Sequence, residues 1–219
     1  MKKLTTSLCL LIIFFFGCKR KINDLEFERS VLMQIIPSIV DSTCQDPRIF
    51  LSPPPYPLLP PDGKISVKEE QFLTKKWELK LDSIRKDTSS VYLAFNPVIT
   101  ASTDSLKKEL ELFTNSKITQ PGFKGKLVLD IDSIKLNQHF KFKYHNLFSN
   151  QLEVWNKKYE FIFSGFFYIS RIVFDDSRSF GALSVGYICG GLCGQGYIIF
   201  IKKHGKNWRI DKIVDTWIS

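Results

Sequence analysis

The sequence predicts an α+β fold, in which amino-terminal helices and a Pro-rich loop pack on a carboxy-terminal antiparallel β-meander. Apolar residues recur at helical spacing in two stretches, 24–40 and 66–84. Prolines crowd into residues 47–62, and this density excludes a helix there. Beyond residue 159, aromatic and β-branched residues dominate between turn residues, as in consecutive strands. A curved sheet enfolding a helix, as in cystatin-like or nuclear-transport-factor-like folds, is the specific form we expect.

The first residues have the parts of a secretion signal. Lys2 and Lys3 precede an apolar segment over residues 8–16, and Gly17 precedes Cys18. This segment is shorter than the about 20 apolar residues that span a membrane. We therefore expect a signal peptide over residues 1–17, a lipidated tether over 18–23, and a single α+β domain over 24–219.

The sequence Phe-Phe-Gly-Cys that ends at Cys18 resembles the lipobox of bacterial lipoproteins. The resemblance implies diacylglycerol on the Cys18 thiol and an acylated new amino terminus. Two or more acyl chains hold a protein stably on a bilayer, because each buried methylene contributes about 0.8 kcal/mol. The alternative is a soluble secreted protein in which Cys18 is only the last residue of the signal.

The chain is basic, and its expected location limits what that charge can bind. Removing Lys2 and Lys3 from the 31 basic residues leaves 29 against 22 acidic ones, so the mature chain carries +7. Nucleic acid is scarce outside the cytoplasm, so anionic lipid, envelope polymers or solubility explain the charge better. In the bacterial lipoproteins that the sequence around Cys18 resembles, surface-export signals carry acidic residues after the Cys. The basic residues 19–21 therefore favour the periplasmic face of the outer membrane.

Three helices are expected before the carboxy-terminal meander. The first begins at Asp24 as its cap, and Pro37 is expected to kink or split it because proline lacks a backbone donor. Ser66 and Glu69 form a capping box that starts the second helix. The third helix is predicted to start near residue 104, with apolar residues again at helical spacing.

The other segments are predicted to be strands. Residues 90–99 alternate imperfectly and contain Pro97, which marks an edge strand or a strand end. Residues 139–145 alternate basic and aromatic side chains, so the basic face is expected to be solvated. Gly165 interrupts the apolar stretch 159–174, which predicts two strands or one strand with a bulge. Strands at 182–189, 197–201 and 208–210 complete the meander.

Three cysteines remain beyond the signal and the anchor: Cys44, Cys189 and Cys193. An odd number leaves at least one unpaired within the chain. In a regular strand the Cα atoms of residues 189 and 193 would lie about 13 Å apart, too far for a disulfide, so a bridge requires a turn. Gly190 and Gly191 supply this turn because they tolerate positive φ. We favour this bridge, and Cys44 with either partner is the alternative.

The hairpin tip that such a bridge would staple is the candidate recognition loop. Its candidate contact residues are Gly190, Gly191, Leu192 and Gln195. A redox dithiol is the weaker interpretation, because the spacing is Cys-x-x-x-Cys and no helix follows to lower a thiol pKa. Recognition is therefore the role expected of this loop.

No other pattern indicates catalysis. The sequence contains no nucleophile elbow, phosphate loop or His-Glu-x-x-His arrangement. His139 and His145 share a strand face but would lie about 20 Å apart, too far to share a metal. The aspartate pairs at 130 and 132 and at 211 and 215 are typical of solvated strand faces. We expect no cofactor and no metal. The alternative to a non-catalytic protein is an envelope enzyme, either a thiol oxidoreductase that uses Cys189 and Cys193 or a hydrolase that uses Asp and His residues.

Parts of the last third resemble a group of uncharacterised lipoproteins from Bacteroidota. The resemblance is carried by Ser170-Arg-Ile-Val-Phe-Asp, Cys189-Gly-Gly-Leu-Cys-Gly-Gln-Gly-Tyr, Ile201-Lys-Lys-His-Gly-Lys-Asn-Trp and Asp215-Thr-Trp-Ile-Ser. It implies an extracytoplasmic lipoprotein and transfers no catalytic residue. We therefore expect a non-catalytic, lipid-anchored protein of the cell envelope that binds a protein or polymer partner and no nucleic acid.

Overall fold

The computed structural model describes residues 23–49, 66–100, 104–120, 122–123, 125–136, 139–148 and 153–219. Within these residues, three helices accompany a large, mostly antiparallel sheet, so the predicted α+β class is confirmed. The predicted signal peptide, Cys18 and most of the Pro-rich loop lie outside the described residues. None of the helices that the structure describes is both long enough and apolar enough to cross a membrane.

Helix α2 (Asp24–Thr43) lies at the centre of the main core. Its fully buried apolar side chains follow the predicted helical spacing: Val31, Leu32, Ile35, Ile36, Ile39 and Val40. The cap is Asn23 and not Asp24 as predicted, because Asn23 Oδ1 accepts the Leu25 amide at 3.2 Å. Pro37 does not split the helix, since buried residues on both sides of it pack into one core.

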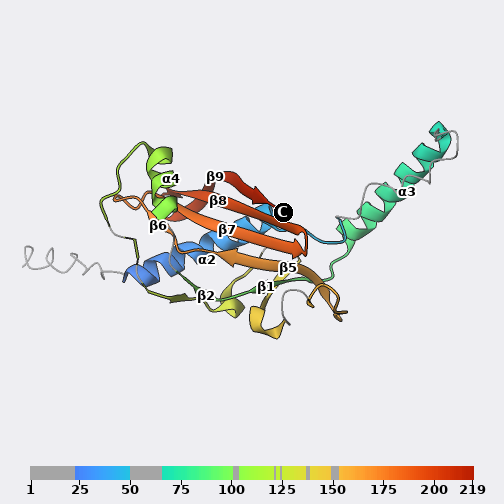
Figure 1. Ribbon diagram of the computed structural model, residues 1–219, viewed down its shortest axis with the longest axis horizontal. Helices are drawn as coiled ribbons and strands as arrows, with labels where there is room; N and C mark the ends of the chain where they lie inside the picture. Colours follow the sequence, from blue (N-terminus) through green and yellow to red (C-terminus); the bar gives the residue numbers. More distant parts are fainter. Residues whose placement is uncertain are drawn as a thin grey trace, which may run out of the picture.

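Helix α3 (Val67–Lys86) extends away from the sheet (Figure 1). Ser66 caps it as predicted, with its Oγ accepting the Glu69 amide at 3.2 Å. Of its apolar stripe, Leu81 is buried whereas Phe72 is 66% exposed. The capping pattern therefore predicted the helix correctly, while the helix itself forms an arm outside the main core.

Among the residues that the structure describes, seven strands form the main sheet. They are β1 (Val91–Phe95), β4 (Phe140–Tyr144), β5 (Ile162–Ile169), β6 (Val173–Phe174), β7 (Phe180–Gly190), β8 (Cys193–His204) and β9 (Asn207–Ile218). Their order is β4-β1-β5-β7-β8-β9, with β6 paired to β7. Strands β5, β7, β8 and β9 form the predicted antiparallel meander. Strand β1 pairs in parallel with both β4 and β5, so Pro97 marks a strand end and not an edge strand.

A β-bulge interrupts β5 at the predicted glycine. Tyr92 pairs with Phe163 and Leu93 pairs with Gly165, which leaves Ser164 as the extra residue. Gly165 has a φ of +150°, and a Cβ there would lie 2.2 Å from the carbonyl oxygen of residue 188. Both the conformation and the close approach therefore require glycine.

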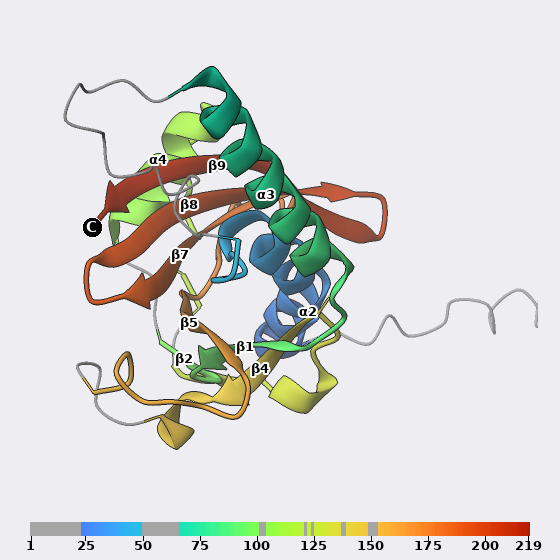
Figure 2. The same cartoon turned by 90° about the vertical axis from the view of Figure 1, so that its right-hand side faces the viewer.

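The main sheet curves around α2, and its two faces bury different elements (Figure 2). Leu183 and Val185 of β7 face α2, whereas Ala182 packs with Leu106 and Leu110 of α4 (Asp104–Thr114) on the opposite face. An aromatic cluster covers another part of this outer face and includes Phe148, Trp155, Phe163 and Phe166. The small strands β2 (Val98–Ile99) and β3 (Leu127–Val128) pair separately.

Candidate functional site

The β7–β8 hairpin ends in the disulfide that the sequence favoured. Cys189 and Cys193 are joined, with their Cα atoms 5.1 Å apart, and Cys44 is a buried free thiol. The turn lies at the two glycines as predicted, but neither Gly190 nor Gly191 adopts the positive φ that glycine tolerates. The pairing register shifts at Cys189 instead, and this bulge brings the two sulfur atoms together across the turn.

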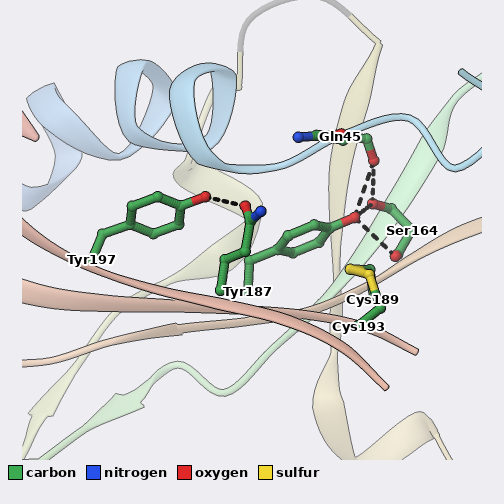
Figure 3. Close-up of a disulfide and its surroundings, with 7 residues drawn as sticks. Gln45, Ser164, Tyr187, Cys189, Cys193 and Tyr197 are labelled. Carbon is green, nitrogen blue, oxygen red and sulfur yellow. Dashed lines mark hydrogen bonds between the residues drawn. A yellow bond between two sulfur atoms is a disulfide. The ribbon is translucent and has the colours of Figure 1, made fainter. Parts of the chain in front are cut away.

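The candidate recognition residues occupy different positions on the hairpin. Leu192 is 93% exposed at the turn, beside the exposed Gly191. Gln195 is half-buried on β8, where its Oε1 accepts a hydrogen bond from the Tyr197 hydroxyl (Figure 3). Gly191 and Leu192 therefore form the accessible tip, while Gln195 is engaged inside the molecule.

Buried hydrogen bonds hold the base of this hairpin. Ser164 Oγ donates to the Gln45 carbonyl oxygen at 2.7 Å and lies 2.8 Å from the Tyr187 hydroxyl, beside the disulfide (Figure 3). Burial raises the pKa of Tyr187 to about 12, and the hydrogen bond with Ser164 only partly opposes this effect. These hydrogen bonds connect β5, β7 and the segment just after α2, and they restrict the motion of the residues at the base of the hairpin.

A small cavity, the aromatic pocket, lies beside the hairpin tip. It has a volume of about 230 Å³ and is lined by Trp155, Phe166, Ile188, Gly190, Gly191, Trp217 and Ser219. None of these side chains is charged. Pockets that enclose a drug-sized ligand measure about 300–1,000 Å³. The aromatic pocket therefore fits one ring or one apolar side chain of a larger partner better than a complete small molecule.

Two glycines of β8 form the floor beneath Trp217. A Cβ on Gly196 would lie 1.9 Å from Trp217 Nε1, and a Cβ on Gly194 would lie 3.0 Å from Trp217 Cζ3. The indole therefore lies directly on the backbone of β8 and remains 46% exposed. This contact of the Trp217 ring with Gly194 and Gly196 was not predicted from the sequence. Its signal is the pair of glycines two residues apart, which share one strand face and leave it open for a neighbouring aromatic ring.

A charged cluster lies where the chain leaves α2. Arg48 Nη2 contacts Asp46 Oδ2 at 2.7 Å, and His139 Nε2 lies 3.3 Å from the same oxygen. Burial raises the pKa of Asp46, but hydrogen bonds from Arg48 outweigh this effect and leave the pKa below its ordinary value. Arg48 also reaches Asp87 just beyond α3. The cluster therefore connects the segment after α2 with the end of α3 and with His139, which precedes β4.

The other titratable residues that the sequence singled out do not converge. His139 and His145 lie at opposite ends of β4, and Asp130 caps a 3-10 turn at Ile131–Ser133. Asp211 and Asp215 are exposed on β9. In the part of the chain that the structure describes, no three His, Cys, Asp or Glu side chains form a group suited to a metal.

Comparisons of this chain with family models, with curated proteins and with solved structures return no match. The aromatic pocket and the disulfide-linked tip beside it combine apolar aromatic walls with an exposed rim, which suits a binding role.

Proposed function

We propose that this chain is a lipid-anchored protein of the bacterial cell envelope that binds a polymer or protein partner through the aromatic pocket. The observation that carries the proposal is the pocket itself, whose side chains are all uncharged and which is walled by Trp155 and Trp217 and sized for one ring. Tryptophan faces supply large apolar contact area at small cost in conformational entropy. The partner therefore inserts an uncharged ring or apolar side chain, and the exposed Leu192 contacts it at the rim.

Rigidity of the hairpin supports binding. The Cys189–Cys193 bridge closes the tip, and the bonds of Ser164 and Tyr187 fix its base. Little conformational freedom remains to be lost when a partner docks, and such preorganisation improves affinity. The candidate acid and base residues of the sequence do not line this pocket, so its geometry supports binding better than catalysis.

The anchor in this proposal is Cys18, with the basic tether placing the protein on the periplasmic side of the outer membrane. Helix α2 has 20 residues, so its ends are about 30 Å apart. Gln45, just beyond the carboxyl end of α2, lies beside the hairpin base. A chain tethered at its amino end would therefore carry the aromatic pocket well away from the lipid.

Photo-crosslinking in intact cells tests the binding proposal. A photoreactive residue at position 192 is expected to capture one recurrent envelope polymer or protein. The matched control places the same residue at position 112 on α4, where Leu112 is 77% exposed, and is expected not to capture it. Equal capture from both positions, or none from position 192, would contradict the proposal.

Two glycine variants connect the crosslink to the pocket. Gly196→Ala is expected to displace the Trp217 indole and abolish capture from position 192, because the added methyl overlaps the ring. Gly122→Ala, at a glycine that does not line the aromatic pocket, adds the same methyl into open space and is expected to preserve capture. Tryptophan fluorescence reports whether the ring has moved. Capture that survives a displaced Trp217 would exclude the aromatic pocket as the binding site.

Metabolic labelling with an alkyne fatty acid tests the anchor separately. The wild-type chain is expected to incorporate the label and to fractionate with membranes, and Cys18→Ala is expected to lose the label. A label that persists in Cys18→Ala, or is missing from the wild type, would reject the lipid anchor while leaving the pocket experiment unaffected.

A further inference from the structure

The turn between β8 and β9 carries several basic side chains, and the acidic residue nearest to them in the sequence is Asp211. We define the basic turn as Lys202, Lys203, Lys206 and Arg209. Lys203, Lys206 and Arg209 are exposed, and Lys202 is half-buried with its Nζ 5.0 Å from the centre of the Phe180 ring. No Asp or Glu occurs between residues 176 and 211. The basic turn is therefore a patch of four positive charges.

The basic turn lies at the end of the molecule where α2 begins. Trp208, at the start of β9, packs its ring 6.2 Å from that of Phe27 in the first turns of α2. The Lys203 amide donates to the carbonyl oxygen of residue 179, in the loop that leads into β7. In the same loop, Arg178 pairs with Asp24 at 2.8 Å. These contacts place the basic turn beside the first residues of the domain.

Most acidic side chains at this end are already engaged. Asp24 pairs with Arg178, and Asp176 accepts hydrogen bonds from the Thr119 hydroxyl at 2.5 Å and from the Gln120 amide at 3.0 Å. Asp175 accepts the amides of residues 179 and 180 at 2.7 Å each. Glu26 is exposed in the first turn of α2. Asp211 is exposed on β9, two residues after Arg209. The four charges of the basic turn outweigh these two carboxylates and give the end of the molecule a positive surface.

We infer that the basic turn docks on an anionic lipid surface, next to the point where the tether enters the membrane. This inference rests on the proposed lipid anchor. A six-residue tether spans at most about 20 Å when fully extended, so the start of α2 stays near the headgroups. Residues 19–21 in the tether sequence are also basic. Attraction to anionic headgroups acts within a Debye length, about 8 Å at physiological salt, which this tether allows.

Docking at this end gives the molecule a defined orientation. The basic turn and the start of α2 lie at the membrane, and the disulfide-linked tip lies near the other end of that helix, about 30 Å away. Electrostatic docking would thus keep the aromatic pocket facing away from the lipid, where a partner can reach it.

Lysine labelling of the natural lipoprotein tests this orientation. The full processed chain is loaded into vesicles of phosphatidylcholine, either alone or mixed with phosphatidylglycerol, and amine acylation is followed by mass spectrometry. Lys203 and Lys206 are expected to react several-fold more slowly on the anionic vesicles, and 1 M salt is expected to remove the difference. Lys75 and Lys76, exposed on α3, serve as internal references. Equal rates on both vesicle types would overturn the inference.

A matched pair of variants assigns the effect to the basic turn. Each basic side chain near an anionic surface strengthens binding about fivefold. Lys203→Gln is therefore expected to weaken the protection of Lys206 about fivefold, while Lys75→Gln leaves it unchanged. Unchanged protection of Lys206 in Lys203→Gln would contradict the inference. Failure of the chain to associate with neutral vesicles would instead reject the lipid anchor, and this separate measurement distinguishes the two failures.

Discussion

Glu28 and Arg171 form a buried ion pair between α2 and the segment that joins β5 to β6. Both side chains are essentially inaccessible, and Arg171 Nε donates to Glu28 Oε2 at 2.7 Å. The Ile172 amide donates to Glu28 Oε1 at 2.8 Å, and Arg171 Nη1 donates to the Gly125 carbonyl oxygen at 2.7 Å. The cost of burying two charges is offset only when their remaining polar atoms are also paired, as they are here. The pair therefore fixes α2 against the sheet in one position.

Removing one partner of this pair is expected to be costly. Glu28→Gln leaves the Arg171 guanidinium buried without a counter-charge, and we expect a loss of about 3 kcal/mol in the free energy of unfolding. Urea denaturation measures it. Glu26→Gln, at an exposed position two residues earlier, makes the same chemical change and is expected to stay within about 0.5 kcal/mol of wild type. Similar losses in both variants would show that the pair contributes nothing specific.

The raised pKa of Tyr187 predicts that the free energy of unfolding decreases at alkaline pH. Burial raises its pKa in the folded chain to about 12, against 10.0 for an unperturbed phenol. Between these values the unfolded chain loses the proton while the folded chain retains it, so stability falls as pH rises through this window. Tyr187→Phe removes that contribution, and its free energy of unfolding is expected to fall less steeply between pH 10 and pH 12. Urea denaturation at each pH measures this free energy. An identical dependence on pH in wild type and variant would show that Tyr187 does not cause the loss of stability.

At the scale of elements, the β7–β8 hairpin is held by its register as well as by its disulfide. Pairing runs from Phe180 with Lys202 to Ile188 with Gly194, and Leu183, Val185 and Ile199 are buried within it. The bridge joins residues only four apart in sequence. A disulfide stabilises the folded chain by lowering the conformational entropy of the unfolded chain, and a bridge that closes a short loop lowers it little. This bridge is therefore expected to stabilise the protein less than one that closes a long loop.

The double variant Cys189→Ser with Cys193→Ser is therefore expected to fold. In the chain-entropy model we expect it to lose about 2 kcal/mol of stability. Circular dichroism should retain the sheet signal, and thermal unfolding measures the loss. Wild-type protein in reducing agent provides the comparison without a substitution. Loss of the sheet signal in either sample would mean that the bridge, and not the register, maintains the hairpin.

The sequence predicted an element most accurately where a few neighbouring residues specify it. The capping box of Ser66 and Glu69 gave the start of α3, and the glycine at 165 gave the bulge of β5. The cap of α2 was misplaced by one residue, because Asn23 and Asp24 are both good capping residues and only the bond to the Leu25 amide decides between them.

On the scale of the whole molecule, α3 stands apart from the main sheet (Figure 1). An isolated helix is marginally stable in water, so α3 is expected to open before the strands do. Limited trypsin digestion should therefore cut at Lys75, Lys76 or Lys80 before it cuts at Lys141 of β4, although all four side chains are exposed. Cleavage in β4 before α3 would show that α3 opens less readily than the strands and would contradict this prediction.

The fragments from cleavage in α3 are expected to remain together. Helix α2 lies on the amino-terminal side of the cut and is buried against β7 and β8, which lie on the other side. Native mass spectrometry should detect the nicked chain at the mass of the intact protein plus water. Separation of the fragments would mean that the connection through α3, and not the packing of α2, unites the molecule.

The sequence by itself determined the α+β class, the amphipathic α2, the antiparallel strands from β5 to β9 and the favoured cysteine pair. Each follows from the periodicity or spacing of neighbouring residues, which local backbone geometry converts into structure. Tertiary structure alone decided the parallel insertion of β1, the Glu28–Arg171 pair and the seating of Trp217 on Gly196. These contacts join residues whose proximity depends on how the sheet curves around α2. No local pattern specifies that curvature, so the aromatic pocket could not be predicted from its residues.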